Sequence, residues 1–327
     1  MIPLLTGAAA GALYLTLPSL RHNFDGVACA IAVELGDVRH LVHGNHLVYG
    51  LVGWLFYRVV NGVGLPVPAL WSLQLMDSLL GALGAGLFAR HLLRRGRAPA
   101  AAAAASLGLA VSWGWWLRSL DAQVYLLAAP FVILFLDEAL SDRPRPMRIA
   151  VLHTGAMLVH ASHALLAPAA LWSLWRGEPD PAARKRAVGR YLAFCASAVV
   201  AAYAAALTEC VRPASMAATR LWLLGSAALG PGRSYHWLAP SSPLSGLRFW
   251  AGTSLGVVSV VPAAGLGLWA LAVWGASRPR AGRERTLAVL WVLPYALFFV
   301  NWEPWNKDYR IMDLVPLWAL AAAAVPE

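Results

Sequence analysis

A polar stretch near the N-terminus, NFDGVACAIAVELGDVRHLVHGNHLVYG, carries residue types that acid–base and phosphate chemistry use. Asp25 follows the first apolar segment by a few residues. An acid so close to the hydrocarbon edge is costly unless it is used or paired, and it is suited to take a proton from an incoming hydroxyl. We therefore predict Asp25 as a general base, and Glu34 and Asp37 as ordinary acids on the polar face of an interfacial helix.

Three histidines of this stretch, His40, His43 and His46, are spaced three residues apart and could share one helical face. With Asp37 they offer a set of zinc ligands. Gly44, however, interrupts helical regularity, and no HExxH pattern supplies an acidic general base. We therefore expect phosphate contacts or simple hydrogen bonds from these imidazoles. No cofactor is expected, and a divalent metal is the lesser alternative.

Further polar side chains interrupt the apolar runs. LRSLDAQVYLL contains Asp121 and Gln123 and predicts a pocket shared with the N-terminal acid. HASH contains His163, for which a hydrogen-bonded turn and an incomplete haem site are alternatives. NWEPWNKDYR contains Lys307 and Arg310, cations suited to a phosphate or pyrophosphate, although a loop with internal ion pairs is also open. Further arginine candidates for the same role are Arg212, Arg220, Arg233 and Arg248.

The composition is that of a membrane protein. Of the 327 residues, 59% are hydrophobic and 13% are charged, whereas soluble domains have roughly 25% charged residues. The net charge of +10 is concentrated in clusters that each separate two apolar runs, as short cytoplasmic loops do under the positive-inside rule. This placement argues against nucleic-acid binding. The four basic clusters are Arg90–Arg97, Arg143–Arg148, Arg176–Arg190 and Arg278–Arg285.

We expect an all-α bundle of about ten transmembrane helices, with the whole chain in one domain. Placing the basic clusters inside leaves residues 21–68 and 209–249 on the outer face. His46–Leu65 is apolar enough to span, but a span there would invert every later loop, so we expect it at the interface. Around His160–His163 we expect two short helices that meet in a hairpin, because this arrangement leaves the basic residues at both ends of the segment on the inner side. Asp77, in the middle of a helix, is expected to be structural.

The order of these motifs resembles the bacterial GT-C-fold membrane glycosyltransferases, including protein O-mannosyltransferase-like and aminoarabinose-transferase-like families. FDG stands where those families carry an acid after the first helix, and HGNHLVYGL where they carry an HPPGYPLY-type segment. LQLMDSLLGAL resembles their LNLLSALFGAL-type helix, and DAQVYLL their AEVYAL type. The resemblance covers roughly the first half of the chain. Their prolines and second acid are missing, and Gln123 replaces a common Glu.

The resemblance implies sugar transfer from a polyprenyl-phosphate donor to an acceptor hydroxyl at the outer face of the cytoplasmic membrane. The acceptor is left open among a lipid, a glycan and a protein. Asp25 would deprotonate this hydroxyl, and cations would neutralise the departing lipid phosphate, where charge grows in the transition state. The implied substrate-binding residues are His43, His46, Asp121, Gln123, His163, Lys307 and Arg310.

Three other functions are alternatives. A transporter or flippase would usually show inverted repeats and polar helix centres, whereas here the polar groups gather on one side. A metal- or haem-binding subunit would use the nine histidines. The third alternative is an inactive or truncated family member that serves as a scaffold. The missing prolines are consistent with lost activity, and the end of the chain at Glu327, where the last expected helix ends, is consistent with truncation.

Overall fold

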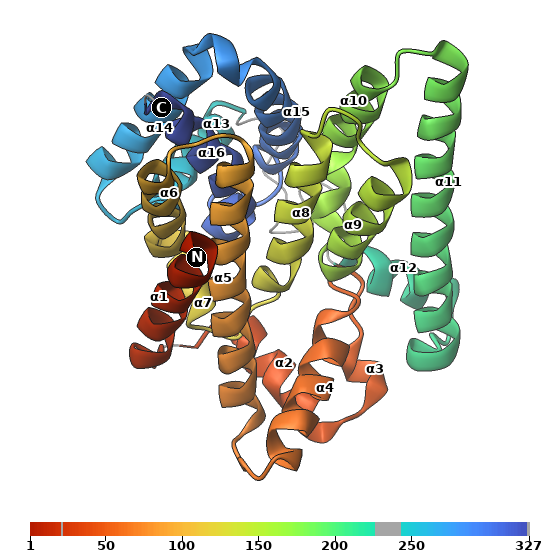
Figure 1. The fold of residues 1–327 in the computed structure, drawn as a ribbon. Helices are drawn as coiled ribbons and strands as arrows, with labels where there is room; N and C mark the ends of the chain where they lie inside the picture. Colours follow the sequence, from red (N-terminus) through yellow and green to blue (C-terminus); the bar gives the residue numbers. More distant parts are fainter. Residues whose placement is uncertain (21, 226–242, 326–327) are drawn as a thin grey trace.

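The computed structural model describes residues 1–20, 22–225 and 243–325. Within these ranges the chain forms helices and loops without a β-strand, which confirms the predicted all-α class. Figure 1 shows the helices in one assembly. In chain order they are α1 (Ile2–Thr16), α2 (Phe24–Leu35), α3 (Val38–Leu41), α4 (Tyr49–Gly62), α5 (Ala69–Arg94), α6 (Pro99–Val111), α7 (Trp113–Ser119), η1 (Leu126–Ala128), α8 (Ala129–Ala139), α9 (Pro146–Val159), η2 (Ala161–Leu166), α10 (Ala167–Gly177), α11 (Pro181–Ala205), the π-helix η3 (Ala206–Val211), α12 (Met216–Leu224), α13 (Pro243–Gly256), α14 (Pro262–Ser277), η5 (Pro279–Ala281), α15 (Gly282–Phe299), η6 (Lys307–Asp313) and α16 (Leu314–Ala324).

Among the described residues, two helices are long and apolar enough to cross a membrane, namely α5 and the continuous helix Pro181–Val211. The bent pair α6–α7 is a third if its two parts form one span. Only 17% of the apolar window in Pro181–Val211 is buried. A long apolar helix with so much exposed surface is suited to lipid contact. The other helices are shorter or less apolar, so the count of about ten spans stays a prediction.

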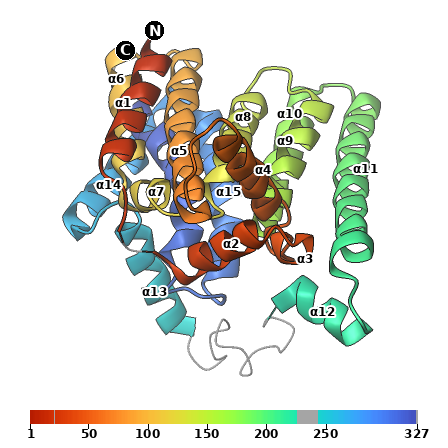
Figure 2. The same ribbon diagram turned by 90° about the horizontal axis from the view of Figure 1, so that it is seen from below.

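The basic clusters share one end of the molecule, the upper end in Figure 1. Arg97 pairs with Glu284 at 2.5 Å, and Arg283 pairs with Asp142 at 2.5 Å. Arg176 donates to the carbonyl group that ends α8. These contacts bring together the segments that carry three of the clusters and the end of α8, which precedes the fourth, as expected if all four lie on one side of a membrane. We call this the basic end. Helices α2, α3, α4 and α12 lie at the opposite end, which Figure 2 shows face on.

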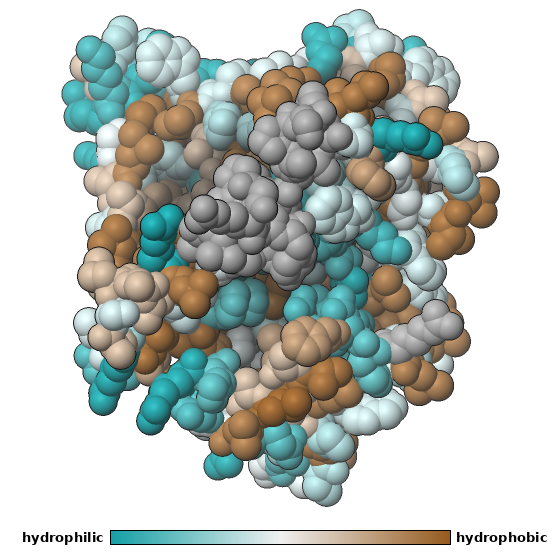
Figure 3. All heavy atoms as spheres, turned by 180° about the vertical axis from the view of Figure 1, so that it is seen from behind, coloured by the Kyte–Doolittle hydropathy of each residue, from teal (hydrophilic) through white to brown (hydrophobic). Residues whose placement is uncertain are grey.

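Many large hydrophobic side chains are exposed between the ends. Figure 3 shows brown hydrophobic residues interspersed with teal hydrophilic ones on the face seen from behind, with a group of hydrophilic residues at its upper left corner. On α1 and α11 the exposed residues include Leu4, at 79%, and Val200, at 67%. Large exposed apolar side chains in such numbers suit contact with lipid.

Helices α9 and α10 form the expected hairpin. The chain turns at His160, and α10 returns until Gly177 lies beside Pro144, just before α9 begins. The apolar runs 99–116 and 250–275 are each broken into two helices. α6 and α7 meet at 65°, and residues 257–261 separate α13 from α14.

Backbone hydrogen bonds join the two helix breaks. The Trp113 N–H donates to the Val258 carbonyl at 2.9 Å, and the Gly114 N–H donates to the Val257 carbonyl at 2.8 Å. Backbone groups freed by a helix break must find partners away from water. Each break therefore stabilises the other, a pairing that local sequence cannot reveal.

Candidate functional site

A pocket of about 490 Å³ opens beside α2. Asp25 lines it from the first turn of that helix, and His40, His43 and His46 line it from the segment between α2 and α4. The structure thus brings the predicted base together with two of the three predicted imidazole ligands, His43 and His46. Its remaining walls are mostly apolar and partly exposed, and comprise Phe24, Ala28, Cys29, Ile31, Ala32 and Leu35.

The position of Asp25 is set by its neighbours in the chain. The Asn23 side chain caps α2 by accepting the Asp25 N–H at 3.2 Å. Gly26 lies so close to the next loop that a Cβ atom there would be 2.3 Å from the Ala122 carbonyl oxygen. The exposed Asp25 carboxylate makes no hydrogen bond within the described parts of the chain.

Asp121 ties this helix start to a buried ion network. Its Oδ2 atom accepts the Asn23 N–H at 3.3 Å and the Arg118 guanidinium at 3.2 Å. Arg118 also forks onto Asp308, at 2.9 and 2.6 Å. Burial raises the pKa of Asp121, and the charge of Arg118 opposes that rise. Asp121 is therefore occupied by protein donors and acts mainly as an anchor.

Lys307 lies next to this network. Its ammonium group sits 5.2 Å from the centre of the Trp113 ring, within the range of a cation–π contact. Burial lowers the pKa of Lys307, and the charge of Asp308 opposes that change. Because Arg118 is shared between two carboxylates, Lys307 is the better candidate of the two for binding an anion.

Residues 43–46 form a tight turn that three elements clamp. The Ala161 N–H donates to the Asn45 carbonyl at 2.8 Å, and the Tyr203 hydroxyl donates to the Gly44 carbonyl at 2.6 Å. α12 passes so close that a Cβ on Gly44 would be 2.1 Å from the Trp222 carbonyl oxygen. Packing therefore requires glycine at position 44. HGNH is a turn whose first and last residues, His43 and His46, are two of the histidines that line the pocket.

The rings of His43 and His46 stack with their centroids 4.2 Å apart. Burial lowers the pKa of both, and the charge of Asp25 partly offsets this for His43. His43 Nδ1 accepts the Asn45 N–H at 3.2 Å, so its neutral form carries the proton on Nε2. At neutral pH these side chains can thus donate hydrogen bonds without a full charge.

Asp77 and Gln123 support the site from behind. Asp77 Oδ2 accepts the Tyr49 hydroxyl and the Gln123 backbone N–H, both at 2.8 Å. Asp77 is fully buried, in keeping with the structural role expected for it. The Gln123 Nε2 atom is buried without a hydrogen-bond partner in the described ranges. Gln123 is not among the residues that line the pocket, so no contact there supports the predicted substrate-binding role of its side chain.

Two other predicted ligands also lie away from the pocket lining. His163 is buried and shares a 2.7 Å hydrogen bond with the Tyr295 hydroxyl. Arg310 is 1% exposed, pairs with Asp313 at 3.4 Å and packs over the Phe299 ring. Both side chains point to internal partners instead of open space, because a buried polar group needs such partners.

An aromatic group that sequence reasoning did not assign lies near the histidine turn. Tyr125 stacks on His160, with centroids 5.5 Å apart, and meets Tyr309 edge-on at 6.2 Å. His160 directly precedes Ala161, whose N–H bonds the Asn45 carbonyl, so the group adjoins the histidine turn. The segments HASH and QVYLL contain these residues and could have indicated such a group. Whether His160 or His163 contacts Tyr125, however, depends on how the turn folds.

Scans against protein-family models, curated protein sequences and solved structures give no match to this chain. In the described residues, no group of three or more His, Cys, Asp or Glu side chains is placed to hold a metal ion. Of the further arginine candidates, Arg212 pairs with Glu209 at 3.9 Å, and Arg233 lies outside the described residues.

Proposed function

We propose that the chain is a membrane glycosyltransferase of the outer face of the cytoplasmic membrane. It moves a sugar from a polyprenyl-phosphate donor to an acceptor hydroxyl, and Asp25 is the general base. The observation that carries this proposal is the pocket itself, in which an unpaired carboxylate faces neutral imidazoles on an exposed apolar surface, opposite the basic end. That surface suits a lipid-borne substrate.

In this reaction the acceptor hydroxyl gives its proton to the Asp25 carboxylate. The acceptor oxygen forms a bond to the anomeric carbon, and the bond from that carbon to the lipid phosphate breaks. The phosphate leaves with the bonding electron pair. Hydrogen bonds from His43 and His46, and the charge of Lys307, would stabilise the developing anion. Exposed Phe24, at 82%, would contact the lipid chain.

The decisive experiment is a transfer assay in membranes with labelled polyprenyl-phosphate sugars. Asp25→Asn should lower label release by at least about 100-fold, the usual contribution of a general base. Asp37→Asn is the matched control, because Asp37 caps α3 through the Arg39 N–H and asparagine keeps that cap. It should retain nearly full activity.

Equal release by wild type and Asp25→Asn would remove this residue from the mechanism. If wild type released no sugar from any of a panel of polyprenyl-phosphate donors, the transferase proposal itself would be wrong. A lipid-translocation assay in vesicles would then test the transporter alternative.

A further inference from the structure

We propose that Arg118 is a positioning residue of the transfer reaction, because its guanidinium group joins the helix that carries Asp25 to the segment that carries Lys307. This role rests on the proposed function. The Nη1 atom of Arg118 bonds Asp121, and its Nε and Nη2 atoms bond Asp308. Arg118 thus acts through these two acids and needs no contact with the substrate.

On the side of the base, Asp121 links Arg118 to the start of α2. Asp121 Oδ2 accepts a hydrogen bond from Arg118 at 3.2 Å and the Asn23 backbone N–H at 3.3 Å. Asn23 caps α2, and its side chain accepts the Asp25 N–H. A displacement of the guanidinium group would therefore pass through Asp121 to the first turn of α2, where Asp25 lies.

On the side of the cation, Asp308 accepts two hydrogen bonds from Arg118, at 2.9 and 2.6 Å. This fork fixes the orientation of a carboxylate as well as its position. Lys307 directly precedes Asp308 and holds its ammonium group 5.2 Å from the centre of the Trp113 ring. Trp113 and Arg118 both belong to α7. This one short helix therefore places the Lys307 segment through two contacts.

The bend between α6 and α7 places Arg118 among these acids. The two helices meet at 65°, and the Trp113 and Gly114 N–H groups bond the break between α13 and α14. α7 therefore leaves the axis of α6 and carries Arg118 in its last turn. The Arg118 side chain is 8% exposed, and those of Asp121 and Asp308 are 3% and 11% exposed. Because packed contacts with little water transmit a displacement, the position of Arg118 sets the positions of both acids.

The first test measures hydrogen exchange of the purified full chain in detergent, for wild type, Arg118→Lys and Arg97→Lys. Lysine keeps the positive charge but has no planar fork with which to hold two carboxylates. Arg118→Lys should speed exchange at the start of α2 and in η6 by about 10-fold or more, because it loosens both ends of the link. Arg97→Lys should leave both segments at the wild-type rate.

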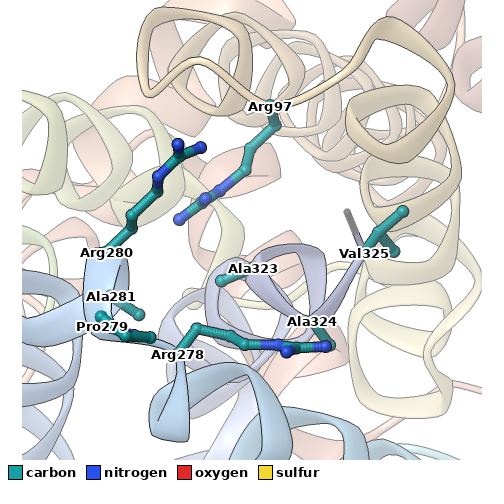
Figure 4. A pocket seen from close by; sticks show the side chains of 8 residues that line it. All are labelled: Arg97, Arg278, Pro279, Arg280, Ala281, Ala323, Ala324 and Val325. Carbon is teal, nitrogen blue, oxygen red and sulfur yellow. The ribbon is translucent and has the colours of Figure 1, made fainter. Parts of the chain in front are cut away.

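Arg97→Lys is the matched control. The Arg97 side chain is also 8% exposed and also pairs with a buried acid, Glu284, at 2.5 Å. It lies at the basic end, where Figure 4 shows it beside a cavity. Both replacements therefore disturb a buried ion pair, but the Arg97 pair joins the α5–α6 loop to α15.

The second test is the transfer assay in membranes. Arg118→Lys should lower kcat by about 10- to 100-fold, because a misplacement of ~1 Å can cost about 100-fold. KM for the lipid-linked donor should change by less than about threefold, and Arg97→Lys should keep the wild-type kcat. In the Asp25→Asn background no base remains to be positioned, so Arg118→Lys should lower the residual rate by a much smaller factor. A loss of folded protein would instead lower both rates by the same factor.

Unchanged exchange of either segment, or an unchanged kcat, in Arg118→Lys would overturn the proposal. An equal loss of kcat in Arg97→Lys, or the same factor in the Asp25→Asn background, would also overturn it. If wild type releases no sugar while Arg118→Lys loosens both segments, the link is structural and the positioning role falls with the proposed function. If Arg118→Lys does not fold, Asp308→Asn keeps one acceptor for Arg118 and should loosen both segments and lower kcat in the same way.

Discussion

Tyr49 and Asp77 show how single side chains support the pocket from within the protein. The Tyr49 hydroxyl is fully buried and donates to Asp77 at 2.8 Å. Asp77 in turn fixes the loop that holds Asp121, through the Gln123 N–H. Removing one partner of a buried hydrogen bond leaves the other partner unsatisfied and costs about 1–3 kcal/mol, more than the loss of an exposed hydrogen bond.

Tyr49→Phe should therefore lower the thermal unfolding temperature by several degrees, corresponding to about 1–3 kcal/mol. The measurement is a melting curve in detergent. Tyr57→Phe is a matched control on the same helix, because the Tyr57 hydroxyl donates to Glu34 at 3.0 Å in an exposed position. Its effect should be below about 1 kcal/mol. Equal effects of the two variants would contradict the buried role of Tyr49.

At the scale of elements, the HGNH turn depends on the close approach of α12. Nothing in the backbone conformation of Gly44 requires glycine, since its φ is not positive. The requirement is steric, because a Cβ would meet the Trp222 carbonyl oxygen at 2.1 Å. Overpacking against backbone typically costs about 1–3 kcal/mol.

Gly44→Ala should accordingly displace the histidine turn from α12, destabilise the chain by about 1–3 kcal/mol and lower any activity of the Asp25 pocket. Gly189→Ala in α11 is the control, because nothing lies within 4 Å of a Cβ there and alanine favours a helix. Melting curves of the two variants should move in opposite directions. An unchanged melting curve for Gly44→Ala would show that α12 can move away from a Cβ atom at residue 44 without loss of stability.

At the scale of the whole molecule, buried imidazoles make stability depend on pH. Burial lowers the pKa of His160 to about 3, and the pKa of His46 is also lowered well below its ordinary value. The unfolded chain, with an imidazole pKa near 6.5, then binds protons first as the pH falls. The stabilisation is complete above pH ~6.5 and is lost progressively below it.

We therefore expect the unfolding temperature in detergent to fall between pH 7.5 and pH 5. The raised pKa of Asp121 acts in the opposite direction, so a variant is needed to isolate the imidazole. His160→Asn keeps an acceptor for the Ser162 N–H and should flatten the pH dependence. The same slope in wild type and His160→Asn would exclude His160 as its source.

Features that depend on local pattern could be predicted from the amino-acid sequence. Apolar runs and basic clusters predicted an all-α chain with the four basic clusters at one end, and both features are observed, because charge and hydropathy act residue by residue. Polar residues near the first helix predicted a pocket, and Asp25, His43 and His46 do line one.

Only the tertiary structure decided which polar side chains remain open and which find internal partners. Asp121, His163 and Arg310 look like Asp25 as members of polar motifs, but Asp121 accepts the distant Asn23 N–H and His163 bonds the distant Tyr295 hydroxyl. Arg310 pairs with Asp313, three residues along the chain. The paired helix breaks and the clamped HGNH turn likewise depend on contacts between segments far apart in the chain. Such contacts follow from how buried donors and acceptors are paired in three dimensions, which no local pattern encodes.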